Sequence, residues 1–158
     1  MIDIRPAVPA DVATILRFVR DLATFEREPD AVEATQATLH EALFGDRPAA
    51  EALVAHGTDA ALGFALFFHN FSTWTGRRGL YLEDLYVTPD ARGLGVGGAL
   101  LRALAAIALD RGCARFEWSV LDWNAEAIAF YRSVGAVGMD GWTIQRVTGD
   151  ALIRLAGR

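Results

Sequence analysis

Four glycines within six residues, between Gly93 and Gly98, separate a strand-like segment from a helix-like segment. Because glycine has no side chain, successive backbone N–H groups of such a turn can converge on an anion. The positive end of the dipole of the following helix adds to the attraction. The spacing therefore predicts a loop that binds phosphate groups.

Two other phosphate-binding loops fit this sequence poorly. A Walker loop needs a lysine that reaches the outer phosphates of a nucleotide, and all 15 basic residues of this chain are arginine. The dinucleotide fingerprint G-x-G-x-x-G does fit Gly93, Gly95 and Gly98, with Asp122 about where a ribose-binding acid is expected. In that fold the strand runs almost directly into the first glycine, whereas five residues separate Val87 from Gly93 here. Too few residues follow the loop to complete that fold.

A third spacing, R-x-x-G-x-G, uses Arg92, Gly95 and Gly97 and resembles the pyrophosphate loop of the GNAT acetyltransferases, which bind acetyl-coenzyme A. A second segment, from Asn124 to Gly135, resembles the N-x-x-A-x-x-x-Y motif and helix-ending glycine of the same family. Two motifs in the right order are more specific than either one alone. The resemblance implies that acetyl-coenzyme A is bound by Leu85, Tyr86, Val87, Arg92, Gly93, Leu94, Gly95, Val96, Gly97, Gly98 and Asn124.

Different parts of this set are expected to hold different parts of the cofactor. The backbone of residues 85–87 is expected to bind the pantetheine arm, whose amides resemble a peptide, and residues 92–98 the pyrophosphate. Arg92 either adds positive charge or packs its side chain across the loop. Asn124 caps the following helix, contacts the cofactor or does both. No metal is expected, because Cys113 is the only cysteine and the three histidines are scattered without ligand spacing.

Acetyl transfer to an amine needs a neutral nitrogen, yet an alkylamine with a pKa of about 10 is mostly protonated at neutral pH. Glu83 and Asp84 interrupt an otherwise apolar strand, where burial can raise a carboxyl pKa toward the range of a general base. Neighbouring residues of a regular strand face opposite sides of the sheet, so both carboxylates can face one substrate only at a bulge. We predict that Glu83 is the base, acting through water, and that Asp84 binds the cationic amine.

The leaving group is a thiolate, which departs faster when an acid protonates it. Tyr131 is the candidate acid, because a phenol with a pKa of about 10 stays protonated at neutral pH and can give its proton to a sulfur of similar basicity. In the enzymes that this chain resembles, the tyrosine at this position of the motif has that role.

Other stretches resemble the spermidine/spermine N-acetyltransferase branch of the family and its thialysine-acetylating relatives. They are Glu83-Asp84-Leu85-Tyr86-Val87, Trp74-Thr75-Gly76, Trp123-Asn124 and Gly141-Trp142. Trp74 and Glu26, which belongs to an acidic cluster, are further candidates for substrate binding. Phe25 stands where polyamine acetylases of this branch tend to carry a tyrosine, so the substrate stays open between a diamine, a polyamine, a thialysine-like amino acid and another amine. Arg77 and Arg78 either meet a substrate carboxylate or lie in solvent.

Composition restricts the partners of the protein. The formal net charge of −5 argues against nucleic acid and is compatible with a cationic substrate. No apolar run approaches the roughly 18 residues that span a membrane, and the first residues lack the pattern of a signal peptide. We therefore expect a cytoplasmic protein that binds a small-molecule amine, without nucleic acid or membrane. The family resemblance implies a homodimer.

The chain of 158 residues is expected to form one domain, residues 1–158. Its pattern predicts a helix opened by Pro9 and Asp11, helices at 35–44, 96–110 and 125–134, strands at 2–6, 51–56, 60–71, 80–87 and 116–121, and a final hairpin of residues 142–147 and 151–155. This order resembles the GNAT fold. The resemblance implies an α/β protein with a central mixed, mostly antiparallel sheet of about seven strands flanked by about four helices.

A second hypothesis keeps the cofactor and drops the catalysis: a non-catalytic acyl-coenzyme A binding regulatory module. Tyr131, Glu83 and the uninterrupted glycine loop favour the N-acetyltransferase, in which the amine attacks acetyl-coenzyme A directly. Turnover with any amine separates the two hypotheses.

Overall fold

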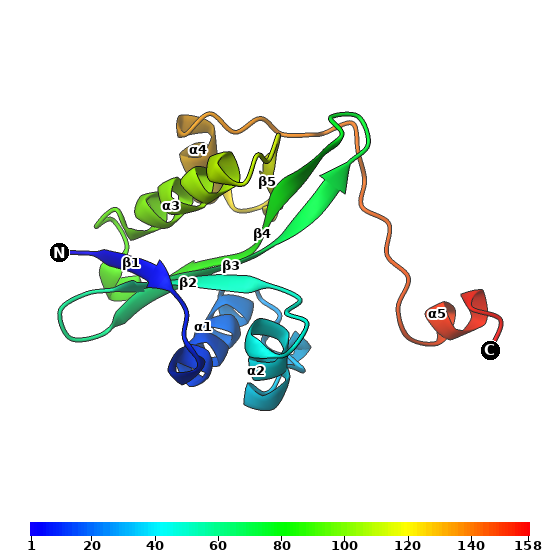
Figure 1. The fold of residues 1–158 in the computed structure, drawn as a ribbon, viewed down its shortest axis with the longest axis horizontal. Coiled ribbons are helices and arrows are strands. Elements are labelled where there is room, and N and C mark those ends of the chain that lie inside the picture. The colour runs from blue at the N-terminus through cyan, green and yellow to red at the C-terminus, as the bar shows by residue number, and fades with distance from the viewer. The chain divides into compact units, whose positions relative to one another are not determined.

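The computed structural model describes residues 1–158, which divide into two compact units, Met1–Leu121 and Asp122–Arg158. In the first unit, one sheet contains, in chain order, β1 (Asp3–Pro6), β2 (Glu51–His56), β3 (Ala61–Ser72), β4 (Arg77–Val87) and β5 (Phe116–Trp118). The helices of this unit are α1 (Val12–Phe25), α2 (Gln36–Phe44) and α3 (Val96–Asp110), with short 3-10 turns η1 (Pro9–Asp11), η2 (Pro29–Ala31) and η3 (Pro89–Ala91). Figure 1 shows α1 and α2 on one face of the sheet and α3 on the other.

The sheet is mixed and mostly antiparallel, as predicted. Neighbouring strands from β1 to β4 run antiparallel, and β5 runs parallel to β4. The strand at 80–87 begins three residues earlier than predicted, at Arg77, and the strand at 116–121 ends earlier, at Trp118. Both differences lie at element ends, which local patterns define least well.

Strand β4 changes its neighbours along its length. Strand β5 pairs only with residues 80–82 of β4, whereas β3 pairs along nearly the whole of the other edge. At Glu83 the ladder with β3 contains a bulge, where one extra residue of β4 has no partner. On the side of β5, residues 83–87 pair with no strand of the unit. The sheet therefore leaves open an edge that leads to the glycine loop.

Helix α1 is amphipathic and turns its apolar side toward the core. It buries Val12, Ile15 and Leu16, and also Phe18, whose ring stacks on that of Phe64 with centroids 5.9 Å apart. The buried residues of α3 are Val96, Leu100, Leu101, Leu104 and Ala108. Burying these apolar side chains fixes both helices against the sheet.

The second unit holds two helices, α4 (Ala125–Ser133) and α5 (Gly149–Leu155). Asn124 caps α4, since its Oδ1 accepts a hydrogen bond from the N–H of Ala127 at 3.2 Å. Helix α4 ends just before Gly135, whose φ of 95° lies in the left-handed region that favours glycine. The predicted cap and the predicted helix-ending glycine are confirmed.

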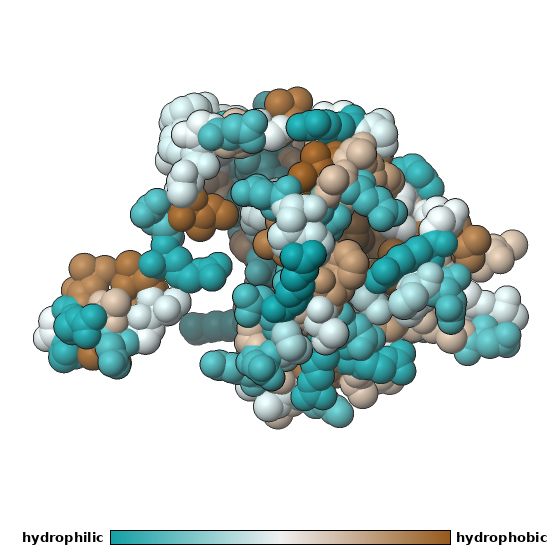
Figure 2. All heavy atoms as spheres, turned by 180° about the vertical axis from the view of Figure 1, so that it is seen from behind, coloured by the Kyte–Doolittle hydropathy of each residue, from teal (hydrophilic) through white to brown (hydrophobic).

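The predicted C-terminal hairpin is wrong. Residues 142–147 contain no strand, and residues 151–155 belong to α5. Short apolar runs fit either a strand or a helix, and Asp150 in the first turn favours the helix. The sheet therefore has five strands instead of about seven, and the chain has five α-helices instead of about four. Apolar side chains of α5, among them Leu152 and Leu155, are exposed (Figure 2).

Candidate functional site

The glycine loop presents uncapped backbone N–H groups at the start of α3. Gly93 and Gly95 have φ angles of 79° and 85°, a conformation that residues with a Cβ rarely adopt. Gly95 is the N-cap of α3, and no side chain bonds to the first turn of the helix. The N–H groups of residues 96–98 precede the first i→i−4 bond, which runs from Ala99 to Gly95. These donors and the helix dipole are available to an anion.

The side chain of Arg92 packs across the loop, one of the two alternatives that the sequence leaves open. Its Nε donates a hydrogen bond to the carbonyl of Val87 at 3.2 Å. Its guanidinium lies 5.2 Å from the centroid of the Phe25 ring, at the end of α1. Arg92 thus connects the glycine loop with β4 and with α1.

Residues 85–87 lie on the open edge of β4, and their side chains differ in burial. Leu85 and Val87 are half-buried, and Tyr86 is buried against Phe18, with ring centroids 5.3 Å apart. Burial raises the pKa of Tyr86, and the charge of Asp21 raises it further. Since the Tyr86 side chain belongs to the core, its backbone is the part available to a ligand.

Three of the predicted site residues are carboxylates that the first unit brings together. Asp84 is half-buried, and burial raises its pKa from 3.8 to about 6, with further contributions from the negative charges of Glu83 and Glu26. Glu83 is exposed at the bulge, and Glu26 is half-buried, which raises the pKa of its carboxyl as well. The bulge that was the condition for Glu83 and Asp84 to face one substrate is present.

A tight turn at the end of α1 positions Glu26. The N–H of Glu28 donates to the carbonyl of Ala23 at 2.9 Å and that of Arg27 to the carbonyl of Thr24 at 3.1 Å, the pattern of a Schellman motif. Such motifs usually have glycine in the left-handed position, which Arg27 occupies here with a φ of 66°. The other acidic residues of the predicted cluster, Glu28, Asp30 and Glu33, are exposed.

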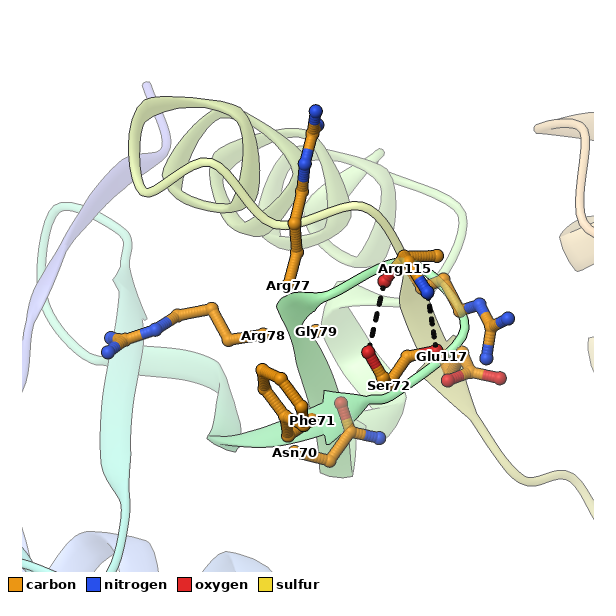
Figure 3. Close-up of a pocket in the computed structure, with 9 residues that line it drawn as sticks. Asn70, Phe71, Ser72, Arg77, Arg78, Gly79, Arg115 and Glu117 are labelled. Atoms are coloured by element: carbon orange, nitrogen blue, oxygen red, sulfur yellow. Dashed lines mark hydrogen bonds between the residues drawn. The ribbon is translucent and has the colours of Figure 1, made fainter.

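Trp74 lies in the turn between β3 and β4, at the opposite end of β4 from the glycine loop. It is 80% exposed, and the guanidinium of Arg115 lies 6.0 Å from its ring. A pocket of about 150 Å³ opens beside this turn (Figure 3). Arg77 and Arg78 both line this pocket, and their side chains extend in different directions.

Tyr131 lies on α4 in the second unit, on the same helix that Asn124 caps. Its ring is half-buried, with its centroid 5.6 Å from that of Phe130. Each unit therefore contains part of the predicted site: the first has the carboxylates and the glycine loop, and the second has Tyr131 and Asn124.

Arg102 is a basic residue near the loop that the sequence pattern did not single out. A Cβ placed on Gly98 would lie 3.3 Å from its Nη1 atom, so the guanidinium lies over the first turn of α3. Helical side chains lean toward the N-terminus of their helix, and an arginine four residues after a glycine was the available signal.

No helix in the structure combines the length and the apolar character that crossing a bilayer requires. No group of three or more histidine, cysteine, aspartate or glutamate side chains is placed to hold a metal ion.

An open sheet edge leading to a glycine-rich helix start is the arrangement expected of an enzyme that binds an acyl-coenzyme A. The chain belongs to the acetyltransferase (GNAT) family, whose model matches residues 16–136 and thus parts of both units. The predicted family, fold class and enzyme class are confirmed, and the chain is an acetyltransferase.

The chain is similar to several named proteins over nearly its whole length. The chain is 39% identical to a thialysine N-epsilon-acetyltransferase of Sus scrofa, over 98% of this chain and 97% of that protein. It is 36% identical to the spermidine/spermine N(1)-acetyltransferase-like protein 1 of Homo sapiens, over 97% of this chain and 23% of that protein. An integron cassette protein from the mobile metagenome of V. cholerae has a similar structure, with a TM-score of 0.82, 27% identity and coverage of 99% and 98% of the two chains.

Proposed function

We propose that this acetyltransferase moves the acetyl group of acetyl-coenzyme A to a primary amine of a small cationic substrate, a diamine, polyamine or thialysine-like amino acid. The observation that carries the substrate proposal is the cluster of Asp84, Glu83 and Glu26. Three carboxylates, of which Asp84 and Glu26 are half-buried, favour a cation over a neutral or anionic ligand. The names of the relatives, thialysine and spermidine/spermine acetyltransferases, agree with this substrate class.

The cofactor proposal follows the open edge and the loop. Backbone groups of residues 85–87 bind the pantetheine arm, and residues 92–98 bind the pyrophosphate, with the N–H groups of residues 96–98 as donors. Acetyl-coenzyme A is a co-substrate that supplies the acetyl group as a thioester, and the reaction uses no metal. Asn124 adds a cofactor contact to its role as a cap.

Two groups move protons in this proposal. Glu83 takes the proton of the ammonium group through water, which its exposed position permits, while Asp84 holds the cation. The neutral amine then attacks the thioester carbonyl, the C–S bond breaks, and Tyr131 protonates the departing thiolate. The proton that the nitrogen loses on becoming an amide passes through water and restores the Tyr131 hydroxyl. Glu26 and Trp74 complete the substrate-binding set.

The remaining parts of the proposal concern the state of the protein. Residues 1–158 form a single catalytic domain, which a family match across both units supports. The protein is a cytoplasmic homodimer that uses neither nucleic acid nor a membrane as partner. Sedimentation equilibrium tests the dimer, and fractionation of cells tests the location.

The enzyme is tested by release of the coenzyme A thiol from acetyl-coenzyme A with spermidine, spermine, putrescine, thialysine, lysine and aminoglycosides. We expect turnover with at least one cationic amine and a fall in kcat of about 100-fold or more in Tyr131→Phe. Tyr81→Phe is the matched control, since the Tyr81 hydroxyl bonds to Ser119 at 2.9 Å and has no role in the proposal. Binding of acetyl-coenzyme A without turnover would favour the regulatory module, and absence of binding would overturn both alternatives.

Separate variants test the two acidic roles. Glu83→Gln is expected to lower kcat with little change in KM for the amine, because it removes the base. Asp84→Asn is expected to raise KM, because it removes the charge that holds the cation. The reverse pattern would exchange the two roles.

A further inference from the structure

We infer that Phe25 is a positioning residue for the cofactor loop, acting through Arg92, and that it couples the cofactor site to the acid-bearing end of α1. This inference rests on the proposed function, because it assumes that residues 92–98 bind the pyrophosphate. Nothing in the R-x-x-G-x-G spacing points to Phe25, which is far from the loop in sequence and lies on another element.

The contacts of Arg92 carry the first step. Arg92 immediately precedes Gly93, and its Nε bonds to the carbonyl of Val87 at the end of the open edge. The planar guanidinium lies 5.2 Å from the centroid of the Phe25 ring, within the range of a cation–π contact. The two salt bridges of the structure, Arg5–Asp11 and Arg111–Glu51, do not involve Arg92. The ring face of Phe25 therefore contacts the outer end of this side chain, whose charge also acts on the neighbouring Tyr86.

The position of Phe25 carries the second step. It is the last residue of α1 and remains 43% exposed, so burial in the core does not account for an aromatic residue here. The next residue, Glu26, contributes to the field around Asp84. The phosphate loop is thus linked through the contact of Arg92 with Phe25 to the residue that directly precedes Glu26 of the carboxylate cluster.

Two consequences follow for binding. Loss of the ring lets Arg92 and the adjoining loop sample other conformations, so coenzyme A binds more weakly although Phe25 does not touch it. Coupling between sites is reciprocal, so a bound cofactor that orders Arg92 also favours the conformation of α1 that presents Glu26 to the amine. The absence of a hydroxyl at Phe25 does not matter for this role, since the ring face makes the contact.

The test is a double-mutant cycle on Phe25 and Arg92, read by calorimetric titration with coenzyme A. Phe25→Leu is expected to weaken binding about three- to tenfold, and Phe25→Tyr to keep the wild-type Kd, because tyrosine retains the ring. In an Arg92→Met background, Phe25→Leu is expected to cause no further loss. Phe71→Leu is the matched control, an exposed phenylalanine on β3 at the far end of the hairpin, and is expected to leave the Kd unchanged.

A second readout separates positioning from a general structural role. With the amine that the thiol-release panel identifies, Phe25→Leu is expected to raise KM for the amine several-fold while kcat stays within about twofold. An unchanged Kd for coenzyme A in Phe25→Leu would overturn the inference, as would a loss of equal size in the Arg92→Met background. Failure of the wild-type protein to bind coenzyme A would overturn the proposed function and this inference together. The two preceding outcomes would overturn this inference alone.

Discussion

Replacing Asp84 by asparagine is expected to stabilise the fold at pH 8 although it impairs the proposed amine site. Burial and the charges of Glu83 and Glu26 raise the pKa of Asp84 from 3.8 to about 6. Each pKa unit corresponds to about 1.4 kcal/mol, so the ionised carboxylate destabilises the folded state by about 3 kcal/mol relative to a solvated one. Asparagine has nearly the same shape and no charge, and it removes this destabilisation.

The stability that Asp84→Asn is expected to add depends on pH. Well below pH 3.8, Asp84 is protonated in the folded and in the unfolded chain, and its raised pKa does not affect stability. As the pH rises from about 4 to 6, the unfolded chain releases the proton first, and the wild type loses stability relative to Asp84→Asn. Above about pH 6 the full difference is present.

Urea unfolding followed by tryptophan fluorescence at pH values from about 4.5 to 8 measures this difference. Asp46→Asn is the control, because Asp46 is an exposed carboxylate in the connection between α2 and β2, and we expect it to change stability little at any pH. Equal stability of wild type and Asp84→Asn at pH 8 would refute the reasoning. So would a stabilisation that has the same size at pH 4.5.

Three further changes test other parts of the structure. Arg27→Gly is expected to be more stable than Arg27→Ala by about 1 kcal/mol in urea unfolding, because only glycine adopts a φ of 66° without strain; equal stabilities would contradict this. In Gly63→Ala the new Cβ would collide with the carbonyl oxygen of Tyr86. This substitution is expected to lower the free energy of unfolding by about 1–3 kcal/mol and to weaken coenzyme A binding in calorimetry. A melting temperature equal to that of the wild type would argue against the collision. Glu26→Gln is expected to move the acid limb of the pH profile of kcat/KM to lower pH, because it removes one of the charges that raise the pKa of Asp84. The displacement is expected to be less than about one pH unit, since burial is the largest cause of the raised pKa. An unmoved limb would show that Glu26 does not act on the site.

Local features of the structure were the most predictable from sequence. The glycine run, the cap at Asn124 and the glycine that follows α4 depend on backbone conformations that a few neighbouring residues determine. The buried face of α1 follows from the period of the helix. The hairpin expected at the C-terminus is wrong, because a short apolar run satisfies the spacing of a strand and that of a helix equally well.

The sequence by itself determined the family and the enzyme class, because those are recorded in short motifs with defined spacing. Only the tertiary structure decided which of these residues meet. Glu26 approaches Asp84, and Arg92 stacks on Phe25, because α1 and the glycine loop pack at one end of β4. The pKa of Asp84 likewise depends on burial and on charges from another element. Contacts between segments distant in the chain leave no periodic signal, and so they appear only once the chain has folded.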